Sequence, residues 1–151
     1  MKLTQFYDPQ LSKHFRLSEF TRSGTALRRN LDNNPDVDSV EALQELCIHV
    51  LEPLRRRFGI IRITSGFRSA PVNAAIGGSP TSQHLRGEAA DIFLSNNEVG
   101  KKMFYYIRDN LVFDQLLLEF RHNRMHCLHV SYRADGNNRM MARSYYDLTK
   151  K

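Results

Sequence analysis

The sequence predicts an α+β fold, in which helices flank a small antiparallel sheet, and three observations support this prediction. Apolar residues recur at three- and four-residue spacings over residues 40–58, as they do on one face of a helix. The same period returns over residues 99–111. Two strand-like runs, 113–120 and 127–132, are then separated only by a short polar turn, which favours antiparallel pairing.

The first half of the chain is predicted to hold a long loop and a long helix. The segment 22–37 is rich in Arg, Asn, Asp and Gly, which is typical of a loop. The capping-box spacing of Asp38 and Glu41 then predicts the start of the helix. Pro53 lies inside this helix, where its missing backbone donor predicts a kink. Gly59 is suited to end it, because glycine readily adopts the left-handed conformation.

The second half alternates strands with helices. A short helix is predicted over residues 69–76, with a proline in its first turn. Ser95 and Glu98 form a second capping-box spacing, just before the helix of residues 99–111. Runs of β-branched and apolar residues predict the strands, which are 60–64, 89–94, 113–120, 127–132 and 140–146.

Length and composition indicate one globular domain over residues 1–151, and we expect a monomer. Hydrophobic residues at 41% and charged residues at 25% are ordinary for a globular protein. No run approaches the roughly 20 apolar residues of a membrane span, and the N-terminus lacks the apolar segment of a secretory signal peptide. The net charge of +6 favours anionic partners, either nucleic acid or a bacterial envelope. Cys47 and Cys127 are too few for a disulfide framework and are expected to be buried free thiols.

A candidate metal site centres on His84 and Asp91, which lie seven residues apart with Gly87 between them. Asp91 enters an apolar run, and an ionised carboxylate is costly to bury unless a cation or hydrogen-bond donors compensate it. A metal bound jointly by both side chains would supply that compensation. With His129 as a third ligand, the set matches a catalytic zinc whose fourth position is left to water. The spacing alone leaves a structural role open, because an aspartate near a turn also commonly caps backbone amides.

Strand alternation bears on which histidine can join this site. It places His129 on the less apolar face of residues 127–132, together with Cys127 and Ser131, which is consistent with a cleft. His126 has the opposite parity, so a regular strand would direct it elsewhere.

Several motifs, in one order along the chain, resemble those of a known family. The pattern Ser82-Gln83-His84-x-x-Gly87-x-Ala89-x-Asp91, followed by His129-Val130-Ser131-Tyr132, resembles the zinc peptidases of the D-alanyl-D-alanine carboxypeptidase family M15. That family includes cell-wall carboxypeptidases and phage endolysins, and it shares its fold with the Hedgehog signalling domain. The likeness begins upstream at residues 15–20, passes through residues 63–69, and covers roughly residues 13–133.

The resemblance implies one zinc ion per chain, held by His84, Asp91 and His129, in a peptidase that needs a general base to take a proton from the attacking water. Glu119 is the best candidate, because it closes an apolar strand that returns to His129. Several branches of the family instead carry an acidic residue three positions before the last histidine. Here that position is His126, so the choice of base remains open between Glu119 and His126.

Three further residues are candidates for contact with the substrate. Arg68 resembles a family arginine that faces the substrate, where it would hold a peptide carboxylate or polarise the scissile carbonyl. Composition alone would make it an ordinary surface arginine. Ser82 and Gln83 either orient His84, contact the substrate, or are plain loop residues.

The leading functional prediction is a zinc-dependent peptidase that acts on peptidoglycan peptides, as a D,D-carboxypeptidase or an endopeptidase. The alternative is a non-enzymatic zinc-binding recognition domain of the same fold, such as a phage particle component. A nucleic-acid-binding module rests on charge alone, since no known motif of that kind is present. Without a signal peptide, a wall-degrading enzyme is expected to be released by lysis, by a holin-type route or within a particle, which indicates phage or prophage origin.

Overall fold

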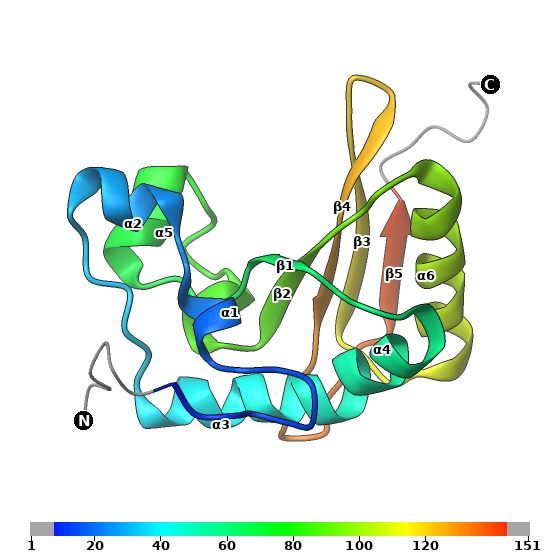
Figure 1. The fold of residues 1–151 in the computed structure, drawn as a ribbon, viewed down its shortest axis with the longest axis horizontal. Coiled ribbons are helices and arrows are strands. Elements are labelled where there is room, and N and C mark those ends of the chain that lie inside the picture. Colours follow the sequence, from blue (N-terminus) through cyan, green and yellow to red (C-terminus); the bar gives the residue numbers. More distant parts are fainter. Residues whose placement is uncertain (1–7, 145–151) are drawn as a thin grey trace.

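A computed structural model describes residues 8–144, in which helices surround a mixed sheet (Figure 1). The strands are β1 (Ile63–Ser65), β2 (Ala89–Phe93), β3 (Gln115–Arg121), β4 (Arg124–Ser131) and β5 (Met141–Ser144). Their order across the sheet is β1-β2-β4-β3-β5. The predicted α+β class is confirmed. Most neighbours are antiparallel, but β5 pairs parallel with β3, which differs from the expected all-antiparallel sheet.

The predicted long helix is present and divides into three parts. The helices are α1 (Ser18–Thr21), α2 (Gly24–Arg29), α3 (Val37–Leu46), the π-helical segment η1 (Cys47–Leu51), α4 (Glu52–Phe58), α5 (Ala70–Ile76), the 3₁₀ turn η2 (Gln83–Arg86) and α6 (Asn97–Asn110). Just before Pro53, where a kink is predicted, η1 interrupts the regular α-helical hydrogen bonding. Proline cannot donate to the carbonyl four residues back, and at this point the Glu52 amide bonds to the Cys47 carbonyl, five residues back.

Several predicted boundaries are wrong. Residues 22–37 are not one loop, because α2 forms within them. The N-cap of α3 is Asp36, whose side chain accepts a hydrogen bond from the Ser39 amide at 2.8 Å, and not Asp38. The N-cap of α6 is Asn96 and not Ser95. In both helices an extended backbone just before the first turn decides which side chain caps it.

The strand ends also differ from the predictions. The first strand begins only at Ile63, and Ile60 is 86% exposed although its β-branched side chain favours a strand. The predicted last strand, 140–146, is present as β5 from Met141 to Ser144, and its final two residues lie outside the described range.

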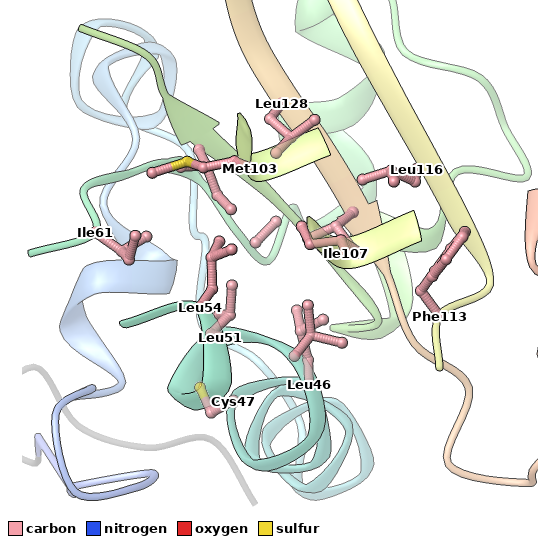
Figure 2. Packing of buried hydrophobic residues seen from close by; sticks show 14 of the residues in the cluster. Leu46, Cys47, Leu51, Leu54, Ile61, Met103, Ile107, Phe113, Leu116 and Leu128 are labelled. Carbon is pink, nitrogen blue, oxygen red and sulfur yellow. The ribbon is translucent and has the colours of Figure 1, made fainter. Parts of the chain in front are cut away.

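The core lies between one face of the sheet and the helices α3, α4 and α6 (Figure 2). Figure 2 shows Leu46 and Leu54 of the long helix and Ile107 of α6 beside Leu116 and Leu128 of the sheet, and all five side chains are fully buried. Alternate strand residues therefore face away from this core. Both cysteines are buried and free, as predicted. Within residues 8–144, the helices are too short or too polar to cross a membrane.

Candidate metal centre

The turn η2 places His84 beside the sheet. The Ser82 hydroxyl accepts a hydrogen bond from the His84 amide at 3.2 Å, which caps the turn. Gly87 ends the turn with a φ of 71°, a left-handed conformation that suits glycine. A Cβ atom at Gly87 would also collide with the backbone carbonyl of Ser39 in α3. The chain can therefore double back from His84 into β2 only because this position has no side chain.

The structure brings His84, Asp91 and His129 together. Asp91 and His129 are direct partners on β2 and β4. His129 Nδ1 lies 2.9 Å from Asp91 Oδ1, and His84 Nε2 lies 3.4 Å from Asp91 Oδ2. One ligand atom from each side chain lies within 4.8 Å of the others, and both histidines are buried. Among the residues described, this is the one such group of three or more metal-type donors.

The donor set and its geometry fit a zinc ion. Tetrahedral ligands about 2.0–2.1 Å from zinc lie about 3.3 Å apart, and the two histidine-to-Asp91 separations here are 2.9 and 3.4 Å. His84 Nδ1 donates to the Gly66 carbonyl at 2.6 Å, so in neutral imidazole the lone pair of Nε2 faces the Asp91 carboxylate. A proton or a metal cation between these two atoms would stabilise this arrangement. A backbone carbonyl that orients the far nitrogen is also usual for histidines that bind metals.

The electrostatics of Asp91 favour its ionised form. Burial by itself would raise the pKa of Asp91, but hydrogen bonds and positive charge from His129 and His84 outweigh that effect and hold its pKa below the usual range. Arg68 adds to this balance, with its Nη2 atom 3.4 Å from Asp91 Oδ2. The Arg68 Nε atom donates to the Ser65 hydroxyl at 3.1 Å, so both contacts fix the guanidinium beside the cluster.

These side chains line a polar cavity of about 670 Å³. Its lining includes seven of the eight residues singled out from the sequence, namely Arg68, Ser82, Gln83, His84, Asp91, Glu119 and His129. A larger groove of about 810 Å³ lies between the α1–α2 region and β1, but this donor cluster does not line it. The chemistry available at the first cavity makes it the candidate site.

Glu119 reaches this cavity from β3. It is paired with Cys127, and Leu117, two residues earlier on the same strand, is paired with His129. Alternation therefore places Glu119 on the same face of the sheet as His129. The Cys127 thiol donates to Glu119 Oε2 at 3.1 Å. Cys127, expected only as a packed thiol, is thus a neighbour of the candidate base.

His126 is exposed and is the one residue singled out from the sequence that does not line the cavity. A β-bulge lies here, because Glu119 pairs with Cys127 while the next residue, Phe120, pairs with Met125. The regular alternation assumed from the sequence consequently ends at Cys127. Met125, not His126, is the residue buried against α6, where its sulfur lies beside Gly100.

The structure also reveals two residues that the sequence reasoning missed, Asp114 and Arg139. Gln83 is buried, and its side-chain amide donates to Asp114 Oδ2 at 2.9 Å. Asp114 is fully buried and forms an ion pair with Arg139, another residue of the cavity. No local pattern marks this pair, because the parallel pairing of β5 with β3 brings the two residues together.

The sequence model for Peptidase M15 matches residues 13–140. The chain belongs to the peptidase M15 family. The match includes every residue of the candidate centre and continues through Arg139. Among proteins with curated descriptions, none matches this sequence. The M15 assignment makes a peptidase, and hence a hydrolase, the class within which this site is interpreted.

Proposed function

We propose that this M15 family member is a zinc-dependent peptidase that hydrolyses peptide bonds of bacterial peptidoglycan. The observation that carries the proposal is the buried cluster of His84, Asp91 and His129 in a polar cavity that Glu119 also lines. Two histidines and one carboxylate leave one position open, as catalytic zinc sites do and closed structural sites do not. The net charge of +6 suits an anionic envelope substrate, and a phage or prophage lytic enzyme is the setting we propose.

In this proposal the three ligands are held in position by the fold around them. A zinc ion bound there would polarise the scissile carbonyl and lower the pKa of water. The Gly66 carbonyl holds the His84 ring so that its Nε2 atom faces Asp91. The backbone pairing of β2 with β4 sets Asp91 against His129. Strand and turn positions would therefore present the three candidate ligand side chains to a metal with little rearrangement.

Glu119 is proposed to act as the general base. Its carboxylate would take the proton of the attacking water and then pass it to the leaving amine, a role worth about a hundredfold to ten-thousandfold in rate. The Cys127 thiol occupies one carboxylate oxygen, Oε2, which leaves Oε1 for the water. His126 is the alternative base, but its bulge position is on the exposed surface.

Arg68 is proposed to stabilise the negative charge that develops on the scissile carbonyl. Its contacts with Ser65 and Asp91 hold the guanidinium in one orientation beside the ligand cluster. A fixed cation is more effective than a mobile one, because it needs no reorganisation as the charge forms. This role fits an endopeptidase, whereas capture of a terminal carboxylate would fit a carboxypeptidase.

The decisive experiment is mass spectrometry of muropeptides after incubation with the zinc-loaded protein. We expect new stem-peptide or cross-link fragments with wild type, release slowed by about a hundredfold or more with the Glu119→Gln variant, and no fragments after chelation. Metal analysis of the same samples should give about one zinc per chain for both proteins. A chain that holds zinc but releases no fragment from any muropeptide would contradict the enzyme and favour the non-enzymatic zinc-binding domain.

A further inference from the structure

The cavity of the candidate centre contains a second fixed cation, Arg139, to which the proposed mechanism gives no role. We propose that Arg139 binds a free carboxylate on the peptide substrate. The inference rests on the proposed peptidase function and narrows its substrate class to stem peptides whose glutamate carboxylate is not amidated.

Asp114 holds Arg139 in place. The Asp114 side chain is fully buried, and each of its oxygens accepts two hydrogen bonds. Oδ1 accepts from the Arg139 amide at 2.9 Å and from Arg139 Nε at 3.0 Å. Oδ2 accepts from Arg139 Nη2 at 2.8 Å and from Gln83 Nε2 at 2.9 Å. This bidentate pair fixes the plane of the guanidinium as well as its position.

The Arg139 side chain is nevertheless 49% exposed, and it lines the cavity together with Arg68 and Glu119. Its Nε and Nη2 atoms donate hydrogen bonds to Asp114. Within residues 8–144 no hydrogen bond involves the remaining nitrogen, Nη1. An arginine that is oriented from behind and open in front is preorganised to receive a carboxylate, since little side-chain freedom is lost on binding.

Figure 1 shows β1 and β5 at opposite ends of the sheet order. Arg68 lies between β1 and α5, at one edge of the sheet, and Arg139 lies just before β5, at the other edge. The candidate ligand Asp91 is on β2, three strand positions from β5. Strands about 4.8 Å apart put the backbones of β2 and β5 about 14 Å apart, which is an upper bound here because the Arg139 guanidinium bonds the same Asp114 oxygen as Gln83, the residue next to His84. An extended peptide advances about 3.3–3.6 Å per residue, so the recognised carboxylate lies within about four residues of the scissile bond.

A peptidoglycan stem peptide satisfies this requirement. Its D-glutamate is joined through the side chain and therefore carries a free α-carboxylate within a short peptide, unless the cell amidates it. The probes are two stem peptides that differ only in this group, the D-glutamate form and the D-isoglutamine form. Both carry a C-terminal amide, so that a terminal carboxylate plays no part in the comparison.

The test is a calorimetric titration of each peptide into the zinc-loaded Glu119→Gln protein, in which the peptide stays intact. We expect the free-carboxylate peptide to bind about ten- to a hundredfold more tightly, the range for hydrogen bonds to a charged group. Adding Arg139→Gln should abolish this preference. The matched control is Arg133→Gln, which removes another cavity arginine whose partner, Asp135, is half exposed, and which should retain the preference.

The inference and the proposed function fail separately. Equal affinity of the Glu119→Gln protein for the two peptides overturns the inference. This comparison does not depend on any substitution of Arg139. A preference that survives Arg139→Gln overturns it as well. Because Arg139→Gln leaves a buried carboxylate unpaired, Arg139→Lys serves as a second variant that keeps the charge but not the planar fork, and it should lower the preference. If wild type binds the carboxylate peptide through Arg139 and yet cleaves neither peptide, the inference stands and the peptidase function falls.

Discussion

The substitution Gly87→Ala tests how the fold positions the candidate centre. Gly87 has a φ of 71° and lies between His84 and Asp91. A left-handed alanine costs roughly 1–2 kcal/mol relative to glycine. The new Cβ would also collide with the Ser39 carbonyl of α3, a backbone atom that can move only if the helix or the turn moves. Forced overpacking costs roughly 1–3 kcal/mol more, so the total loss of unfolding free energy should be about 2–5 kcal/mol.

Gly77→Ala is the matched control. Gly77 ends α5 with a φ of 81°, but a Cβ there would meet nothing within 4 Å. It should therefore lose only the conformational part, about 1–2 kcal/mol. Urea unfolding with zinc and with a chelator measures the unfolding free energy of both variants in each condition. Because the collision displaces the turn that carries His84, Gly87→Ala should also weaken zinc binding, and Gly77→Ala should not. Equal losses of stability and unchanged zinc affinity in the two variants would refute this reasoning.

The remaining predictions concern single functional groups. Glu119→Gln should slow hydrolysis by about a hundredfold to ten-thousandfold while keeping its zinc, and His126→Ala should slow it less; the reverse order in steady-state assays would make His126 the base. Arg68→Lys should slow cleavage of free-acid and C-terminally amidated peptides equally, and a loss confined to free-acid peptides would identify a carboxypeptidase. Asp114→Asn should lower stability at neutral pH. Hydrogen bonds from Arg139 are the main influence on the pKa of Asp114 and, with the charge of Arg139 and the hydrogen bond from Gln83, they lower it below its usual value although burial alone would raise it. The contribution of ionised Asp114 to stability is therefore complete above about pH 4 and is lost as pH falls further. The variant should consequently show a smaller loss than wild type in urea unfolding between pH 5 and pH 2, and an equal loss would contradict the role of this pair.

The sequence could predict those features that depend on local periodicity and composition. The fold class follows from a helical period over residues 40–58 and from alternation in the later strands. Both periods arise because one face of each element is buried and the other is not. The break in regular α-helical hydrogen bonding beside Pro53 follows from its missing backbone donor, whatever the helix packs against. The donors His84, Asp91 and His129 could be singled out because a histidine and a carboxylate lie beside apolar strands that must bury them.

Only the tertiary structure decided where elements begin and which distant groups meet. Asp36 caps α3 because the chain is extended there, although Asp38 has the better capping-box pattern. The bulge at His126 arises from the pairing of β3 with β4. It interrupts the alternation of inward and outward side chains that the sequence alone presents as regular. Arg139 meets Asp114 because β5 joins β3 in parallel. Non-local pairing of this kind is determined by the summed packing of the whole sheet, so residues 114 and 139 carry no local sign of their contact.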